Sequence, residues 1–215
     1  MLEKMGEFFD NRLWGYEEHQ LTAIEGAEAF YPYTAGLLPL GEAHVLDLGC
    51  GTGLELGYYF DRNPMARVTG IDLAPGMLAA LREKFPDKRL ELVQGSYFDV
   101  PLGEARYDAA VSVESLHHFT RDEKTPLYRK VRAALKENAY FILTDYFASS
   151  EAEEVFRRQE LSRLKREQGL SEGEFYHYDT PLTVGHETQA LLEAGFASVE
   201  VLAQWANTCT LKATK

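Results

Sequence analysis

The sequence has 215 residues, of which 45% are hydrophobic and 26% charged, and its formal net charge is −12 at pH 7. This length suits one domain with a substantial core, and no run approaches the roughly 18 apolar residues of a membrane span. The acidic balance argues against general affinity for nucleic acid, and two cysteines make neither a disulfide framework nor a zinc pattern. We therefore expect no nucleic-acid partner and no membrane partner.

Residues 1–42 precede the first expected strand and are rich in aromatic side chains. The beginning, "MLEKMGEFFDNRLW", lacks a basic start followed by an apolar stretch, so we expect no signal peptide and a cytoplasmic protein. Trp14 and Tyr16, in "RLWGYEE", are candidates for a lid over a ligand, with Arg12 beside them.

From residue 43, short apolar runs alternate with helical patterns. The expected strands are 43–48, 66–73, 89–96, 107–113 and 139–147, and the expected helices are 53–62, 75–85 and 121–136. Such alternation is typical of parallel strands joined by helical crossovers that cover both faces of a sheet. The sequence therefore predicts a doubly wound α/β fold.

The C-terminal part follows a different pattern. Residues 151–170 predict a charged helix, and residues 172–181 predict a loop or a short helix. The chain closes with two expected strands that form a hairpin near Ala206 and Asn207. No break in composition marks a linker, so we expect a single domain over residues 1–215.

The stretch "VLDLGCGTG" at residues 45–53 predicts a ligand-binding turn. Gly49, Gly51 and Gly53 follow a buried strand, and glycine lets the backbone turn tightly and a ligand lie against it. The spacing is not that of a dinucleotide fingerprint, because Leu54 follows Gly53, and no P-loop lysine is present. Asp47 before the turn would repel a pyrophosphate and attract an ammonium group.

A second acid, Asp72, ends the next strand, 19 residues after Gly53. An acid at that place accepts hydrogen bonds from both hydroxyls of a ribose. The two acids together predict a nucleoside ligand whose attached group is cationic. S-adenosylmethionine fits this description.

Four motifs carry a resemblance to a known family. In order, "VLDLGCGTG", "GIDLAPGML", "VQGSYFDVPL" and "YDAAVSVESLHHF" resemble the successive motifs of class I S-adenosylmethionine-dependent methyltransferases, across residues 43–147. The resemblance implies a Rossmann-like, seven-stranded, mostly parallel sheet of order 3-2-1-4-5-7-6 with the last strand antiparallel. Residues 1–42 would then form a helical lid, and residues 148–183 a helical insertion on the acceptor side.

The resemblance also implies a set of contacts with S-adenosylmethionine. The backbone of Gly49, Cys50 and Gly51 would cradle the methionine moiety, Asp47 would approach its amino group, and Asp72 would hold the ribose. Leu73 and Met77 would pack on the adenine, Ser96, Tyr97 and Phe98 would line its edge, and Tyr16 and Val113 would border the cofactor. Many relatives carry an acid where this chain has Ser96, and serine accepts a hydrogen bond from the adenine amino group more weakly than an acid does.

His117 and His118 follow the fourth strand and are the candidates for a general base, should the acceptor be a hydroxyl. The run Glu114 to His118 resembles that of methyltransferases acting on sugars and other natural products. Adjacent residues on a helix project in different directions, so we expect at most one histidine to face the acceptor. Alternatively, one packs on the following helix and the other borders the cofactor.

Asp145 and Glu114 each end a strand on the ligand side. Either is a candidate to bind an acceptor amine, to orient a histidine, or to form a structural salt bridge. We expect no metal, because the chemistry of this cofactor needs none.

These observations predict a methyltransferase that modifies a small-molecule oxygen or nitrogen and acts as a monomer or homodimer. Two alternatives stay open. The first is a carboxy-S-adenosylmethionine synthase of tRNA modification, although the segment "EFYHYDTPL" lacks the arginine or lysine that an added carboxylate needs. The second is a protein that binds S-adenosylmethionine without catalysis.

Overall fold

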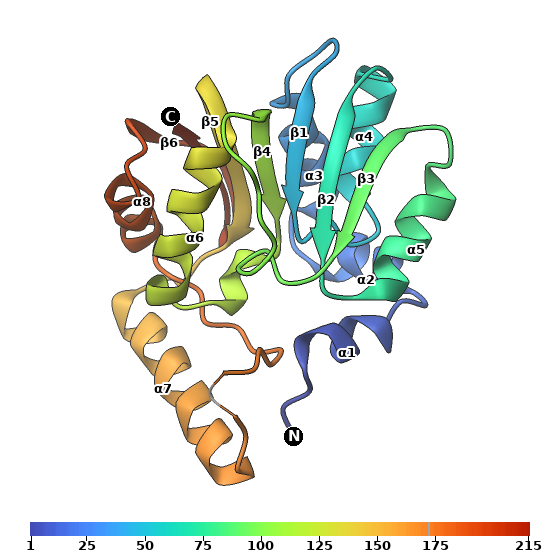
Figure 1. The fold of residues 1–215 in the computed structure, drawn as a ribbon. Helices are drawn as coiled ribbons and strands as arrows, with labels where there is room; N and C mark the ends of the chain where they lie inside the picture. The colour runs from blue at the N-terminus through green and yellow to red at the C-terminus, as the bar shows by residue number, and fades with distance from the viewer. Residues whose placement is uncertain (172) are drawn as a thin grey trace.

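The computed structural model describes residues 1–171 and 173–215 (Figure 1). The helices are α1 (Met5–Asp10), α2 (Tyr16–Ala23), α3 (Ala27–Gly36), α4 (Leu54–Arg62), α5 (Pro75–Lys84), the 3₁₀ turn η1 (Leu116–His118), α6 (Arg121–Ala134), α7 (Glu151–Gln168) and α8 (Val184–Glu193). The strands are β1 (His44–Leu48), β2 (Arg67–Asp72), β3 (Arg89–Gln94), β4 (Tyr107–Val113), β5 (Leu135–Tyr146), β6 (Ser198–Trp205) and β7 (Thr208–Thr214).

All seven strands form one sheet in the order β3-β2-β1-β4-β5-β7-β6. Strands β1 to β5 pair in parallel, and β7 pairs antiparallel with both β5 and β6. The predicted doubly wound fold and its strand order are therefore confirmed. The arrowheads of β1 to β4 point to the end of the sheet where α1 and η1 lie (Figure 1).

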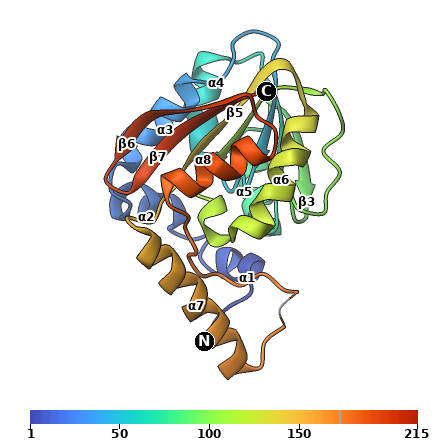
Figure 2. The same cartoon turned by 90° about the vertical axis from the view of Figure 1, so that its left-hand side faces the viewer.

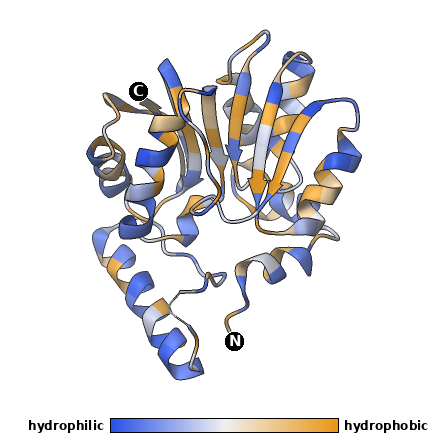
Figure 3. Cartoon of the chain, in the orientation of Figure 1, coloured by the Kyte–Doolittle hydropathy of each residue, from blue (hydrophilic) through white to orange (hydrophobic). Residues whose placement is uncertain are grey.

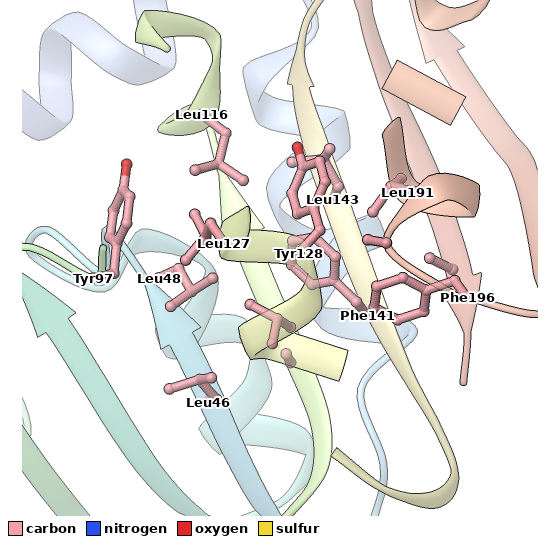
Figure 4. Close-up of a cluster of buried hydrophobic side chains, with 14 of the residues drawn as sticks. Leu46, Leu48, Tyr97, Leu116, Leu127, Tyr128, Phe141, Leu143, Leu191 and Phe196 are labelled. Atoms are coloured by element: carbon pink, nitrogen blue, oxygen red, sulfur yellow. The ribbon is translucent and has the colours of Figure 1, made fainter. Parts of the chain in front are cut away.

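Alternation along the strands creates a hydrophobic core on each face of the sheet. In β1, Leu46 and Leu48 pack in the same cluster as Leu127 of α6, whereas Val45 packs with Tyr59 of α4 on the other face. Figure 4 shows the first of these clusters, between α6 and the central strands. Helices α3 and α4 cover one face, and α6 covers the other (Figures 1 and 2).

Strand β5 begins earlier than the sequence pattern predicts. The predicted helix 121–136 ends at Ala134, and the strand starts at Leu135 rather than at residue 139. Leu135 is fully buried and pairs with Tyr107, while Asn138 adopts a left-handed φ of 63° at an irregularity in the pairing. The polar residues between Leu135 and Ala139 conceal this short extension in the sequence.

The predicted charged helix 151–170 ends at Gln168, because Gly169 takes a left-handed φ of 63° and caps it. Helix α7 extends beyond the sheet in both views and is mainly hydrophilic (Figures 2 and 3). In the predicted segment 172–181, Glu172 lies outside the described residues, and the described remainder forms a loop without a helix.

The N-terminal segment is tied to this loop by backbone hydrogen bonds. The Met5 N–H donates to the Phe175 carbonyl and the His177 N–H donates to the Glu3 carbonyl, both at 3.0 Å. At its other end, α1 is held against α5, because Asp10 Oδ1 accepts a hydrogen bond of 2.8 Å from the Gly76 N–H. The first helix therefore lies across the carboxyl ends of the strands (Figure 1).

A buried ion pair joins α6 to α8. The ammonium group of Lys124 lies 2.6 Å from Glu187 Oε2, and both side chains are 1% exposed. The Tyr128 hydroxyl donates to the other oxygen of Glu187. The carboxylate is thus satisfied by two donors from one helix, so removing one of them leaves a buried charge without compensation.

We expect Lys124→Met to destabilise the protein by about 3–5 kcal/mol, because it leaves the Glu187 carboxylate buried without its counter-charge. The double variant Lys124→Met/Glu187→Leu should recover much of this loss, since it removes both charges. Urea unfolding followed by circular dichroism measures the three free energies. Equal stabilities of the wild type and the single variant would contradict the role of the pair.

Candidate active site

The three glycines after β1 serve different physical needs. All have positive φ, of 74° at Gly49, 47° at Gly51 and 72° at Gly53. A Cβ at Gly49 would lie 2.1 Å from Ser115 Oγ, and one at Gly53 would lie 2.5 Å from a Leu81 methyl group. At Gly51 the nearest atom would be 3.8 Å away. Two glycines therefore permit close packing, and the middle one leaves backbone open to a ligand.

A first cavity, of about 50 Å³, lies against this turn. Eight of the twelve residues predicted to bind the cofactor line it: Tyr16, Gly49, Gly51, Asp72, Leu73, Met77, Tyr97 and Val113. The N-terminal side chains of Met5 and Phe9, together with Tyr16, also border it.

The other four predicted residues do not line the first cavity. The Cys50 thiol points toward β2, where a Cβ at Gly70 would lie 2.7 Å from its sulfur. Ser96 Oγ accepts a hydrogen bond from the Phe98 N–H, and the Phe98 ring packs edge-on against Phe119. Asp47 is completely buried beneath the turn.

The Asp47 carboxylate has an unusual environment. Neither of its oxygens has a hydrogen-bond partner among the described residues. Burial raises its pKa well above the ordinary value, and the charge of the neighbouring Glu55, itself 4% exposed, raises it further. A nearby cation would favour the charged form of Asp47, so this position suits a ligand that brings an ammonium group.

The Asp72 carboxylate connects the end of β2 to the glycine turn. One oxygen accepts from the Gly51 N–H and the other from the Ala74 N–H, each at 2.9 Å. Burial raises the pKa of Asp72, while these two backbone hydrogen bonds oppose the shift. Each oxygen retains a lone pair, so the carboxylate is able to accept further hydrogen bonds from a ligand.

A second, larger cavity of about 600 Å³ adjoins the first. The two cavities share four lining residues, which are Phe9, Tyr16, Glu114 and His118. Aromatic and histidine side chains dominate the second cavity, among them Phe8, Trp14, His117 and His177. Arg12 is its one arginine or lysine among the described residues, and this guanidinium is paired with Glu3 at 2.8 Å.

His117 is held by a carboxylate at the end of β5. Its Nδ1 lies 2.5 Å from Asp145 Oδ1, and Asp145 Oδ2 accepts a hydrogen bond of 2.8 Å from the Leu116 N–H. Burial alone would lower the pKa of His117, but the Asp145 carboxylate outweighs this effect and raises it to about 9. The Asp145 carboxylate thereby fixes both the turn η1 and the orientation of the imidazole.

His118 faces the same cavity as His117, which corrects the expectation that only one histidine would do so. The two rings are 4.0 Å apart, and both lie close to Asp179, with His118 Nδ1 at 3.1 Å and His117 Nε2 at 3.7 Å. The short 3₁₀ turn and the shared carboxylate hold the rings together. Burial and then the charge of His117 lower the pKa of His118.

Asp179 is the residue of this cluster that sequence reasoning missed. It stands in the loop after α7, 61 residues beyond His118, and the Thr180 N–H anchors that loop to the His117 carbonyl at 2.7 Å. The one available signal was an acid two residues after His177, in "HYD". The acid partners of the two histidines, Asp145 and Asp179, therefore come from other parts of the chain.

The strand order and the glycine turn after β1 define a Rossmann-like protein. The profile of the methyltransferase domain family matches residues 45–138. The chain is 30% identical to the carboxy-S-adenosyl-L-methionine synthase of Wolinella succinogenes, over 99% of this chain and 92% of that protein. The chain therefore belongs to the class I S-adenosylmethionine-dependent methyltransferases, and its cofactor is S-adenosylmethionine.

One further relative agrees with this assignment, and a solved structure supports the fold. The erythromycin 3''-O-methyltransferase of Saccharopolyspora erythraea is 30% identical over 73% of this chain, which spans about half of that enzyme (51%). A methyltransferase structure from Thermotoga maritima superposes with a TM-score of 0.67 at 17% identity, covering 98% of this chain and 99% of that one, and so supports the fold. No helix in residues 1–171 or 173–215 is long and apolar enough to cross a membrane.

We expect Gly49→Ala to destabilise the protein more than Gly15→Ala does. Both glycines have a similar left-handed φ, of 74° and 79°, so alanine costs roughly 1–2 kcal/mol at each. Only at position 49 does the new Cβ also collide with Ser115. Thermal unfolding compares the variants, and adding Ser115→Gly to Gly49→Ala should remove the excess loss. Equal losses at positions 15 and 49 would argue against the close contact.

Proposed function

We propose that the protein transfers the methyl group of S-adenosylmethionine to a hydroxyl of a small molecule bound in the second cavity. The observation that carries this proposal is the wall that the two cavities share, with His118 and Glu114 in it. The cofactor supplies an electrophilic methyl carbon, and the acceptor oxygen takes it while the carbon–sulfur electron pair stays on sulfur. The protein has to hold the acceptor in line and help remove its proton.

The cofactor would occupy the first cavity. In this proposal, Asp47 receives the amino group of the methionine moiety, directly or through water, and Asp72 receives the ribose hydroxyls. The unpartnered oxygens of Asp47 and the spare lone pairs of Asp72 support these roles. The backbone from Gly49 to Gly51 cradles the methionine chain, and Leu73 and Met77 pack against the adenine.

The N-terminal residues would act as a lid. Ligand pockets measure about 300–1,000 Å³, so a first cavity of about 50 Å³ is too small for a nucleoside cofactor. Met5, Phe9 and Tyr16 form the part of its wall that comes from outside the sheet and its crossovers. We propose that these side chains move outward when the cofactor enters.

The proposed roles of Asp47 and Asp72 can be tested separately by measuring the binding of two nucleosides, of which only one has an amino group on its side chain. Asp72→Ala should weaken binding of S-adenosylhomocysteine and of 5′-methylthioadenosine alike, by on the order of 1.5–3 kcal/mol, because both contain the ribose. Asp47→Asn should weaken only S-adenosylhomocysteine, because 5′-methylthioadenosine lacks the amino group. Isothermal titration calorimetry measures the four affinities. An unchanged affinity of Asp72→Ala for either ligand would overturn the ribose assignment.

The histidine cluster would activate the acceptor. His118 lines both cavities and His117 lines the second, and Asp145 orients His117. His118 and Glu114 belong to the wall that the two cavities share, and Asp145 lies behind His117. We propose that His117, His118 and Asp145 assist loss of the proton from the acceptor hydroxyl. Should the acceptor be an amine, Glu114 or Asp145 would bind it instead.

His118→Ala should lower the rate of methyl transfer by roughly 10²–10⁴-fold, with little change in the affinity for S-adenosylhomocysteine. The matched control is His19→Ala, since His19 also lines the second cavity but is exposed and lies outside the cluster. A screen of hydroxylated small molecules that follows S-adenosylhomocysteine production supplies the acceptor, and single-turnover rates compare the variants. Equal and modest losses in both variants would refute the role of the cluster.

A carboxy-S-adenosylmethionine synthase is the second candidate, because a protein of that name aligns with 99% of this chain. Its product carries an extra carboxylate, which requires a cation. Within the described residues that line either cavity, Arg12 is the one arginine or lysine, and its charge is already compensated by Glu3. Mass spectrometry of the nucleosides formed distinguishes the two activities, since only the synthase yields a carboxylated S-adenosylmethionine.

A further inference from the structure

Three potential ligand atoms converge at the wall between the cavities. His118 Nδ1 and His117 Nε2 lie 3.1 and 3.7 Å from Asp179 Oδ1, and the ligand atoms of the three residues all lie within 4.8 Å of one another. Ligands at about 2.0–2.2 Å from an ion, with tetrahedral or octahedral angles, are about 2.8–3.6 Å apart. We propose that His117, His118 and Asp179 bind a divalent transition-metal ion.

The hydrogen bonds around the cluster prepare both imidazoles for this role. Asp145 Oδ1 lies 2.5 Å from His117 Nδ1 and accepts a hydrogen bond from it. This hydrogen bond orients the ring so that Nε2 points toward Asp179. A carboxylate behind a ligating histidine fixes the tautomer and raises the basicity of the nitrogen that binds the metal. Asp145 is therefore the positioning residue of the site.

His118 provides the independent observation. The residue is 7% exposed, and its Nδ1 has no hydrogen-bond partner among the described residues, although it lies 3.1 Å from Asp179 Oδ1. With a proton on Nδ1, the two groups attract each other but lack the geometry of a hydrogen bond; without that proton, their lone pairs repel unless another cation lies between them. A metal ion bound to both atoms would satisfy the buried nitrogen and neutralise the carboxylate.

The donor set indicates the kind of ion. Two imidazole nitrogens and one carboxylate oxygen suit zinc, iron, cobalt or manganese, whereas magnesium and calcium prefer oxygen ligands. Glu114, His117 and Asp145 form a second group with converging ligand atoms. That group is less suitable, because the short hydrogen bond already occupies the facing atoms of His117 and Asp145.

The place of the cluster gives the ion a function, and this part rests on the proposed methyl transfer. Three protein ligands leave coordination positions open, and all three ligating residues line the second cavity. An acceptor hydroxyl bound to the ion would release its proton to solvent more readily and be held in one orientation. The acceptor class is then a small molecule whose hydroxyl is able to bind a metal, and a neighbouring second oxygen would strengthen the binding.

Metal binding can be measured without any acceptor. Metal-free protein, prepared without a histidine tag, is titrated with zinc chloride by calorimetry and with cobalt chloride by visible absorption. We expect one equivalent of each metal to bind. Asp179→Asn and His118→Gln should weaken zinc binding at least 10-fold, and Asp145→Asn should weaken it by roughly 10–100-fold, the usual effect of losing the carboxylate behind a ligand.

The control is His186→Gln, which removes a histidine paired with Glu154 outside the cluster and should leave metal affinity unchanged. Retained binding of S-adenosylhomocysteine by Asp179→Asn shows that this variant is folded. Absence of saturable binding of both metals to the wild type, or equal zinc affinity of the wild type and Asp179→Asn, overturns the site.

Activity then separates the two proposals. Methyl transfer that continues unchanged in a chelator overturns the role of the metal in activating the acceptor and leaves the proposed function intact. Specific metal binding by a protein that methylates no hydroxylated molecule overturns the proposed function and leaves the metal site intact.

Discussion

The close approach of two strand-end loops, at Gly49 and Ser115, determines how the two cavities are joined. Strands β1 and β4 are neighbours in the sheet, so the turn after β1 and the segment after β4 leave it side by side. A Cβ atom at position 49 would lie only 2.1 Å from the Ser115 hydroxyl oxygen, so the two loops approach this closely only because residue 49 is glycine. Because η1 begins directly after Ser115, this contact brings the histidines to the edge of the glycine-turn cavity.

The carboxyl end of the sheet gathers acidic side chains. Six buried or half-buried acids lie there: Asp47, Glu55, Asp72, Glu114, Asp145 and Asp179. Doubly wound proteins that bind pyrophosphate present helix N-termini and no such set of acids at this place. The charge distribution therefore selects for cationic ligands, which is consistent with a sulfonium cofactor that also carries an ammonium group.

The fold was predictable because its information is local. Apolar runs such as "AHVLDL" and helical patterns such as "PGMLAALREKF" each specify one element, and parallel strands need crossovers between them. The error at Leu135 arose where three polar residues follow a buried one, so the strand has no visible pattern there. The order of β7 and β6 came from the family resemblance, since pairing between distant strands leaves no periodic signal.

The candidate site was predictable only where its residues follow strands directly, as Asp72 and His117 do. Asp179 belongs to a loop whose path depends on the Thr180 N–H bonding to the His117 carbonyl, a contact between positions 63 residues apart. The common orientation of His117 and His118 likewise depends on Asp145 and Asp179 from other elements. No spacing of residues along the chain predicts such long-range contacts, because they result from how the loops pack at the edge of the sheet.

The antiparallel backbone pairing between the N-terminal segment and the loop of residues 173–181 makes the two cavities mechanically dependent. Two hydrogen bonds of 3.0 Å join Glu3 to His177 and Met5 to Phe175. Met5 covers the first cavity, whereas His177 belongs to the wall of the second. Withdrawing α1 must either carry His177 with it or break both bonds. With the cavities assigned as proposed, opening the first cavity would deform the second, and the binding of cofactor and acceptor would be coupled through these two backbone hydrogen bonds.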